Sequence, residues 1–378
     1  MKDTKTKKRG LAAIFRLCPA RHILILASGL AILLHLLTRD NKSLMSLVSL
    51  KFVRPVHAFL ARVSAFVPFS LAEILVLLFA AGVLAYLLMA LFGLVKAERK
   101  PEKVYIISIT LLSIVLFVYA LFCLLWGVYY YGESFADNMG LRDEAVSVGQ
   151  LEAVTVYFAG LANAYCDQVP RDENGFCAID RDLVLARSDR IYENAERLFP
   201  TLEGPDVRAK GIKVSKLLSF MDTTGFFFPF TGEANVNTHF PSSLFPATVA
   251  HELAHQRGIA QEEQANFIAV LASLESGDAE FCYSAALLAY VHLGNALHGA
   301  DYEAWKEVFS SLDERVVRDI ALENHYWAQF ESPVQDISNA VYEGFLQSYD
   351  QTLGLSSYGA CVDLLVNYYY EKAIAFDR

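Results

Sequence analysis

The chain has 378 residues and a formal net charge of −10 at pH 7, but the charge is unevenly distributed. The first 132 residues contain 16 Lys and Arg against 5 Asp and Glu, whereas the remainder contains 16 basic and 37 acidic residues. A basic, apolar part followed by an acidic part predicts a membrane anchor and a water-exposed domain, and the acidic domain argues against nucleic acid as a partner.

Three long apolar segments predict transmembrane helices at about residues 23–38, 74–95 and 104–128. The second and third segments contain no charged residue and are long enough to cross roughly 30 Å of hydrocarbon. The first segment contains His35 and can also be read as a signal peptide, but no small-x-small cleavage site followed by a soluble segment appears. We therefore expect a three-helix anchor in the lipid bilayer over residues 1–132.

Basic residues around these segments predict the orientation of the chain in the membrane. Seven of them precede the first segment, and the connection between the second and third contains Lys96, Arg99, Lys100 and Lys103. Positively charged flanks remain in the cytoplasm, so we expect a cytoplasmic N-terminus and an extracytoplasmic domain in a multi-pass cell-membrane protein. The basic loop 39–70 conflicts with this rule, although its spacing resembles an amphipathic interfacial segment broken at Pro55.

Residues 133–378 are expected to form one mostly α-helical domain with a small β-sheet. The stretch 205–240 contains β-compatible runs, whereas helical periodicity dominates on both sides of it. Cys166 and Cys177 flank a turn-rich loop, where they can form a disulfide in an oxidising compartment or remain buried thiols.

The sequence His-Glu-Leu-Ala-His at residues 251–255 predicts a zinc site on a helix. Residues four apart share one helix face, so His251 and His255 can bind one ion at about 2.0–2.1 Å. Glu252 can accept a proton from zinc-bound water, whose pKa zinc lowers to about 7. This is the HExxH arrangement of zinc peptidases; the alternative is a pair of surface histidines on an amphipathic helix.

A catalytic zinc site needs a third protein ligand, and the candidates are Gln261, Glu262, Glu263 and Gln264. An amide oxygen is a poor zinc ligand, which leaves the two carboxylates. Glu262 lies four residues before Asn266, whose side-chain oxygen can accept the ring N–H of a metal-bound histidine. The corresponding neighbour of Glu263 is a phenylalanine, so the spacing favours Glu262 and keeps Glu263 as the alternative.

These residues resemble the gluzincin pattern, in which HExxH is followed by E-x-x-x-D on a second helix. Here the second motif reads Glu262-x-x-x-Asn266. The resemblance implies that His251, His255 and Glu262 bind one zinc ion and that Glu252 is the general base. Asn in place of Asp removes the negative charge that strengthens the hydrogen bond to the histidine.

A wider resemblance covers nearly the whole chain. The three apolar segments, "PFTGEANVN", "HELAHQRGIAQEEQANF" and "SSYGACVDLLVNYY" resemble an uncharacterised family of bacterial three-span membrane proteins, domain of unknown function 3810. The resemblance implies a zincin-like α+β metallopeptidase domain after the membrane helices. It favours Tyr358 as the donor to the oxyanion of the tetrahedral intermediate, with His239 and His325 as further candidates.

Gluzincin-like folds bind the extended substrate along an edge strand above the active-site helix. The predicted strand contains Gly232, Glu233, Ala234 and Asn235; the alternative is a buried structural hairpin.

The sequence therefore predicts a membrane-anchored zinc-dependent endopeptidase that hydrolyses peptide or protein substrates near the bilayer. A catalytically silent zinc-binding sensor or interaction module at the cell surface is the alternative. An intramembrane protease is disfavoured, because the HExxH segment contains Arg257 and follows no apolar run of spanning length.

Overall fold

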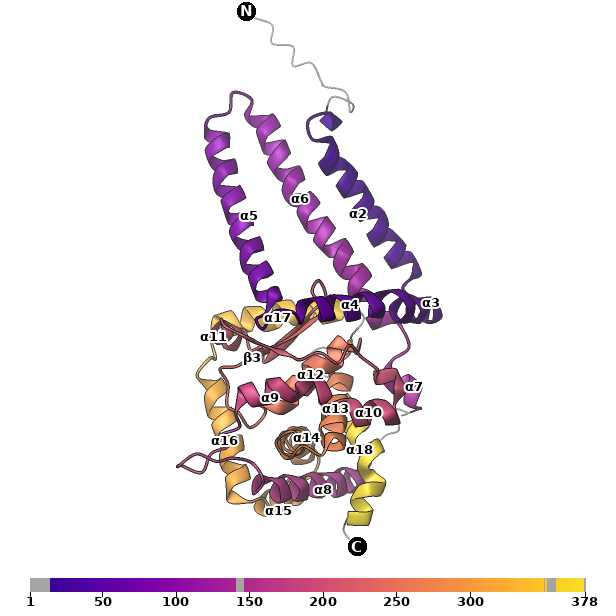
Figure 1. The fold of residues 1–378 in the computed structure, drawn as a ribbon, viewed down its shortest axis with the longest axis vertical. Helices are drawn as coiled ribbons and strands as arrows, with labels where there is room; N and C mark the ends of the chain where they lie inside the picture. Colours follow the sequence, from indigo (N-terminus) through magenta and orange to yellow (C-terminus); the bar gives the residue numbers. More distant parts are fainter. Residues whose placement is uncertain (1–13, 141–145, 350, 352–357, 377–378) are drawn as a thin grey trace, which may run out of the picture.

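The computed structural model describes residues 14–140, 146–349, 351 and 358–376. Helices make up most of this part of the chain, and one small three-stranded sheet accompanies them (Figure 1). The expectation of a mostly helical chain with a small sheet is therefore confirmed.

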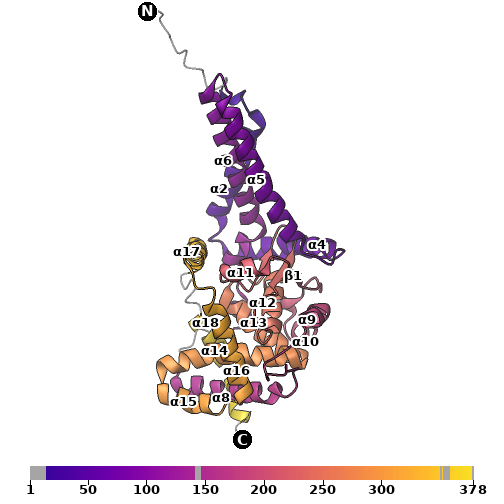
Figure 2. The ribbon, with the colours of Figure 1, turned by 90° about the vertical axis from the view of Figure 1, so that its left-hand side faces the viewer.

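Three long apolar helices stand together at one end of the molecule (Figures 1 and 2). They are α2 (Pro19–Thr38), α5 (Leu71–Val95) and α6 (Lys100–Leu125); the first two contain the predicted segments 23–38 and 74–95, whereas α6 ends three residues before the predicted limit at 128. All three are long and apolar enough to cross a membrane. Most of their leucine and valine side chains are exposed, as expected of helices whose surroundings are lipid.

A fourth apolar segment lies across the foot of these helices (Figures 1 and 2). It consists of α3 (Lys42–Val48), a π-helical turn η1 (Ser49–Val53) and α4 (Arg54–Ser64), and its length and composition would also allow it to cross a membrane. Its two sides differ, because Val53 and His57 are buried whereas Phe52 and Phe59 are exposed. This amphipathic character agrees with the interfacial segment predicted within residues 39–70. The helix is not interrupted at Pro55, which occupies the first turn of α4.

The sheet contains β1 (Lys210–Ile212), β2 (Gly225–Phe228) and β3 (Glu233–Asn237) in the order β1-β3-β2. The central strand β3 runs parallel to β1 and antiparallel to β2, and all five of its residues are buried. The prediction of an edge strand at Gly232, Glu233, Ala234 and Asn235 is therefore wrong. Gly232 lies in the preceding turn at φ 68°, and the three-residue β1 covers the side of β3 that was expected to be open.

The domain is built around five helices that enclose a common apolar core. These are α8 (Val148–Cys166), α12 (Phe245–Gln256), α13 (Glu262–Ser276), α14 (Ala279–Ala300) and α18 (Tyr358–Phe376). The other helical elements are η2 (Gly127–Tyr131), α7 (Phe135–Met139), α9 (Arg181–Arg187), η3 (Ser188–Arg190), α10 (Glu193–Leu198), η4 (Pro200–Leu202), α11 (Ser215–Phe220), α15 (Tyr302–Ser310), α16 (Glu314–Ala328) and α17 (Pro333–Ser348). Small residues such as Ala159, Ala285 and Ala289 face this core, so that α8 and α14 can pack closely.

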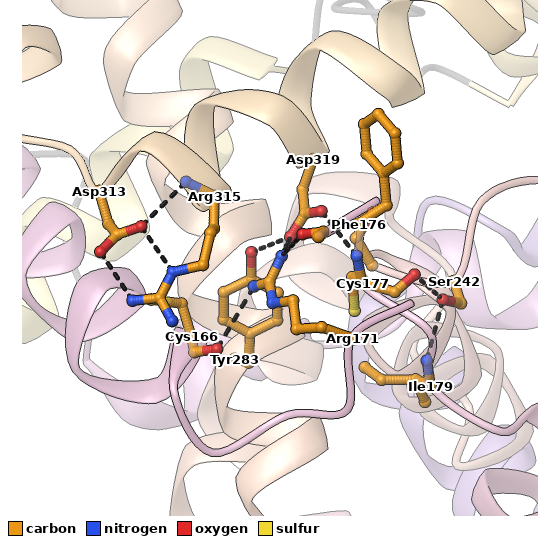
Figure 3. A network of polar contacts seen from close by, with 12 residues as sticks. Cys166, Arg171, Phe176, Cys177, Ile179, Ser242, Tyr283, Asp313, Arg315 and Asp319 are labelled. Atoms are coloured by element: carbon orange, nitrogen blue, oxygen red, sulfur yellow. Dashed lines mark hydrogen bonds and ion pairs between the residues drawn. The ribbon is translucent and has the colours of Figure 1, made fainter. Parts of the chain in front are cut away.

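The loop after α8 is held by a buried polar network rather than by a covalent link (Figure 3). The carboxylate of Asp319 on α16 accepts hydrogen bonds from Arg171 Nη1 at 2.8 Å, from the backbone N–H of Cys177 at 2.9 Å and from the Tyr283 hydroxyl. Of the two alternatives for Cys166 and Cys177, the structure contains buried thiols.

The membrane helices and the domain share a second, aromatic core. Its buried members are Met45, Val53, Trp126, Val128, Tyr129, Tyr130, Tyr131, Ala260 and Tyr349. Ala260 and Tyr349 belong to residues 133–378, and the other members belong to residues 1–132. The anchor and the domain are therefore packed together at this junction.

A buried carboxylate attaches the sheet to the first turn of α5. Glu233 accepts hydrogen bonds from the backbone N–H groups of Leu71 at 3.1 Å and Ala72 at 2.7 Å. It also forms an ion pair with Lys210 Nζ at 2.6 Å and accepts a hydrogen bond from Thr231 at 2.8 Å. A negative charge at a helix N-terminus satisfies unpaired N–H groups and interacts favourably with the helix dipole. The conspicuous "GEAN" segment thus positions a membrane helix.

Candidate metal centre

The HExxH residues lie on α12, whose ends are well defined. Pro246 occupies the first turn, where a missing N–H costs nothing. The helix is followed by Gly258 at φ 87°, in the left-handed region that favours glycine. A Cβ at this position would also lie only 2.5 Å from a ring carbon of Tyr129. The turn between α12 and α13 is therefore fixed by backbone conformation and by a ring of η2, the turn that follows α6.

Three potential ligands come together across this turn. The candidate atoms of His251, His255 and Glu262 all lie within 4.8 Å of one another. Glu262 Oε2 is 3.2 Å from His251 Nε2, and Oε1 is 3.6 Å from His255 Nε2. Ligands held tetrahedrally at about 2.0–2.1 Å from zinc lie roughly 3.3 Å apart, so both the donor types and their spacing fit zinc. Glu263, the alternative carboxylate, is not part of this group.

The histidine rings are oriented differently from the sequence expectation. His255 Nδ1 lies 2.6 Å from the carbonyl oxygen of Ile259, to which it can donate, leaving Nε2 available to a metal. Within the described residues, no hydrogen bond joins Asn266 to either histidine, and His251 Nδ1 is buried without a partner. The backbone of the α12–α13 turn therefore takes the orienting role predicted for Asn266.

Glu252 lies beside the ligands in a buried position. Burial raises the pKa of this carboxyl to about 7, although His251 and His255 act in the opposite direction. Its Oε2 atom is buried without a hydrogen-bond partner among the described residues. A Cβ at Gly225 would lie 2.5 Å from Oε1 of Glu252, so only glycine leaves room for the carboxylate at this point of β2.

The edge strand beside Glu252 is β2. The backbone N–H of Asn237 donates to the Thr224 carbonyl at 2.8 Å, which makes these two residues a hydrogen-bonded pair. Pairing alternates along antiparallel strands. The backbone groups of Gly225 and Phe227 therefore point away from β3, toward the open edge of the sheet.

Tyr342 reaches the centre from α17. Its hydroxyl donates a hydrogen bond of 2.5 Å to Oε1 of Glu262, across 80 positions of the sequence. Burial and the nearby Glu262 carboxylate raise the pKa of Tyr342 well above its ordinary value, so the phenol remains a donor at neutral pH. The sequence analysis missed this residue, because no motif joins α17 to the HExxH helix.

The donors named from the sequence lie elsewhere or outside the described side chains. Tyr358 is the first residue of α18, and its side chain lies outside the part that the structure describes. His239 Nδ1 lies 2.7 Å from the hydroxyl of Tyr326, away from the ligand group. No hydrogen bond joins His325 to the three ligands within the described residues.

Aromatic side chains lie between the candidate ligands and the ends of the membrane helices. Trp126, which follows α6, packs edge-on against His255 with ring centroids 5.9 Å apart. The same indole packs against Phe227 of β2 at 5.0 Å and donates to the Tyr130 hydroxyl at 3.3 Å. The candidate centre is thus in direct contact with the end of a membrane helix.

Comparison with known proteins places the chain in a family. No curated protein and no solved structure matches it. One family model, described as a protein of unknown function (DUF3810), matches residues 49–366 and so includes the sheet, the candidate centre and most of the apolar helices. The chain therefore belongs to the DUF3810 family.

Proposed function

We propose that this protein is a membrane-anchored zinc-dependent endopeptidase with three transmembrane helices, a cytoplasmic N-terminus and a zincin-like domain outside the cytoplasm. The observation that carries the proposal is the grouping of His251, His255 and Glu262, with Glu252 buried beside them and an open strand edge next to Glu252.

The donor set fits zinc. His251 and His255 would hold the ion through Nε2, and Glu262 through its carboxylate, while a fourth position remains for a water or substrate oxygen. When bound, zinc supplies Lewis-acid activation of the attacking water and of the scissile carbonyl group.

The surrounding side chains have separate roles in hydrolysis. Glu252 takes the proton of the attacking water and returns it to the leaving amine, which suits a carboxyl whose pKa lies near neutral pH. Tyr342 donates its single O–H to Glu262 in this structure, and once a bound ion would hold Glu262, the same O–H can turn to the oxyanion that develops during attack.

The substrate backbone pairs with β2. The outward N–H and C=O groups of Gly225 and Phe227 can bind an extended peptide by strand addition. This strand replaces the segment Gly232–Asn235 that the sequence predicted for the same task.

Zinc analysis and a protease assay on the purified full chain test the proposal. We expect one zinc ion per chain and cleavage of fluorescein-labelled casein. Glu252→Gln should retain zinc and abolish cleavage, because it removes the proton acceptor while preserving the shape of the side chain. Glu262→Ala should lose zinc, whereas the matched variant Glu263→Ala should retain it.

The outcomes separate the two candidate functions. A zinc-loaded Glu252→Gln variant that cleaves as fast as the parent chain refutes the mechanism. A chain that binds one zinc ion but cleaves neither casein nor unfolded peptides is instead the zinc-binding sensor or interaction module. Loss of zinc only in Glu263→Ala would overturn the ligand assignment.

A further inference from the structure

Helix α17 has an uncovered apolar face. Val334, Ile337 and Val341 are exposed by 54%, 65% and 69%, and their spacing of three and four residues places them on one side of the helix. Leu346 lies on the opposite side of the helix and is buried, whereas Tyr342, at the margin between the two sides, contacts Glu262. Apolar side chains gathered on one face indicate that something apolar covers it.

The position of α17 indicates what covers this face. α17 and α4 lie at the same level, on opposite sides of the foot of the three long apolar helices, and both run across the direction of those helices (Figures 1 and 2). α4 and its neighbours also expose large apolar side chains, with Phe52, Phe59 and Phe66 exposed by 65%, 65% and 88%. Two amphipathic helices at the end of a spanning bundle occupy the level at which hydrocarbon meets water.

We propose that α17 lies in the membrane interface with Val334, Ile337 and Val341 in lipid, and that the candidate metal centre beneath it acts on extended polypeptide segments anchored in the same bilayer. The placement of α17 stands independently, whereas the substrate class rests on the proposed peptidase function.

Contacts at both ends of α17 connect it to the membrane side of the site. In its first half, Ser338 donates to the Met221 carbonyl at 3.0 Å and Asn339 donates to Asp222 at 3.2 Å, in the turn before β2. In its second half, Phe345 packs against Phe122 of α6 with centroids 5.5 Å apart. α17 therefore crosses from the turn before the edge strand to a membrane helix.

The centre of α17 covers the metal ligands. Tyr342, between these two attachments, contacts Glu262, while Val341 beside it faces outward. A helix whose outer face is in lipid and whose inner face touches a ligand leaves the ligand next to the membrane surface. The aromatic contacts of Trp126 with His255 and Phe227 place the same surface beside β2. A polypeptide held in the bilayer can reach this edge without leaving the interface.

The charges on the neighbouring segment also fit a membrane surface. Lys51 and Arg62 are exposed on the α3–α4 segment, where they can interact with lipid phosphates at the membrane surface. We therefore assign the α17 face to lipid, and the experiment below distinguishes lipid from a protein partner on this face.

Fluorescence in lipid nanodiscs tests the placement of α17. An NBD fluorophore is attached to the full chain at Ile337→Cys or Val341→Cys, and at the matched control Gln347→Cys on the exposed polar flank of the same helix. The six native cysteines are buried, and the unsubstituted chain measures their background labelling. We expect blue-shifted emission and strong quenching by nitroxide-labelled lipids at 337 and 341, and weak quenching at 347.

Equal, weak quenching at all three positions overturns the proposal. A blue shift without lipid quenching also overturns it, because a protein then covers the face.

A peptide assay in proteoliposomes tests the substrate class. The probe is a pool of random fluorogenic decapeptides, with or without an N-terminal palmitoyl chain on a flexible linker. Anchoring raises the local concentration of peptide, so we expect cleavage of the palmitoylated pool to be at least about 10-fold faster. The spanning helices keep the local concentration unchanged in Ile337→Asp combined with Val341→Asp, so this variant should show a smaller preference only because its site no longer lies against the bilayer, while zinc content and cleavage of the unanchored pool persist. The control Gln347→Asp should keep the preference.

The failures of the two ideas can be told apart. Equal cleavage of both pools by the parent chain refutes the anchored substrate class but leaves the peptidase. A zinc-loaded chain that cleaves neither pool refutes the peptidase and, with it, the substrate class, while the quenching experiment still decides where α17 lies.

Discussion

At the scale of single residues, the proposed mechanism gives Tyr342 two tasks, positioning Glu262 before an ion binds and donating to the oxyanion afterwards. It donates to the ligand Glu262 at 2.5 Å and carries a phenol whose pKa is raised well above its ordinary value. Tyr342→Phe should therefore lower kcat for casein or peptide cleavage by about 100-fold, as loss of an oxyanion donor does, while KM and zinc content change little. Steady-state kinetics and metal analysis measure the three quantities.

The matched control for this variant is Tyr326→Phe. The Tyr326 hydroxyl contacts Ser219 at 2.6 Å and His239 at 2.7 Å, and its removal should leave kcat unchanged. A Tyr342→Phe chain that loses its zinc but keeps the same kcat per bound zinc would show that Tyr342 only positions Glu262.

Glu323 on α16 makes the stability of the protein pH-dependent. Its carboxylate accepts a hydrogen bond of 2.7 Å from Ser243 just before α12, and burial raises its pKa from 4.5 to about 7. Between pH 4.5 and about 7, the folded state therefore keeps this carboxyl protonated, whereas the unfolded state releases the proton. The contribution of Glu323 to stability is fully present when this carboxyl is protonated, below about pH 4.5, and it is lost as the pH rises to about 7.

Glu323→Gln should remove this pH dependence. The variant should be more stable than the parent chain at pH 8, by on the order of 2–3 kcal/mol, and the difference should shrink toward pH 5. Thermal unfolding of both chains in detergent across this range measures the effect. An identical pH profile for both chains would mean that Glu323 titrates normally.

At the scale of elements, the central strand β3 serves as an attachment point for α5. Glu233 pairs with buried Lys210 and caps the first turn of α5. Glu233→Ala would leave a buried ammonium group without its partner, and it should destabilise the protein by about 3–5 kcal/mol. Thermal unfolding provides the measurement.

The double variant Glu233→Leu with Lys210→Met is the control for this prediction. Replacing both members of a buried ion pair with apolar residues of similar size is often nearly neutral, so part of the stability should return. If the double variant is no more stable than Glu233→Ala, Glu233 stabilises the protein mainly through its hydrogen bonds to Leu71 and Ala72.

The sequence predicts those elements whose signal is local. Hydropathy identifies the apolar helices α5 and α6, because a long uncharged run in each satisfies the same requirement at every position. The HExxH spacing brings His251 and His255 together, because both lie within one helix. Glu262 was also selected, but through an expected partner, Asn266, that forms no hydrogen bond with the histidines in the described chain; the tight turn at Gly258 brings Glu262 to them instead.

The features that the sequence missed depend on distant parts of the chain. The strand β1 has only three residues, Lys-Gly-Ile, whose sequence carries no alternation of apolar and polar residues, so nothing predicts that it covers β3 and leaves β2 at the edge near Glu252. Tyr342 is 80 positions from Glu262. Such pairings arise from tertiary packing, which neither periodicity nor spacing encodes.

At the scale of the whole molecule, the anchor and the domain are expected to fold together. Trp126 and Tyr129 belong to the same aromatic core as Ala260 and Tyr349, and Trp126 contacts His255. A fragment comprising residues 133–378 would lose most of this core and expose the remainder. We expect it to aggregate and to bind zinc less tightly than the full chain, as measured by size-exclusion chromatography and metal analysis.

A longer fragment provides the control for this expectation. A chain that begins at residue 39 retains the α3–α4 segment, α5, α6 and η2, and it should keep its zinc and remain monodisperse in detergent. A monomeric, zinc-loaded 133–378 fragment would show that the shared aromatic core is dispensable.

The contact between Gly258 and Tyr129 has an evolutionary consequence. A side chain at position 258 would meet both an unfavourable backbone angle and the ring of Tyr129 at 2.5 Å. Homologues that replace the glycine should therefore favour asparagine, which tolerates this conformation best among the residues with a side chain, and should carry a small residue at the position of Tyr129. Paired substitution at these two positions, which lie far apart in the sequence, would show that the turn between α12 and α13 and the segment after α6 have evolved together.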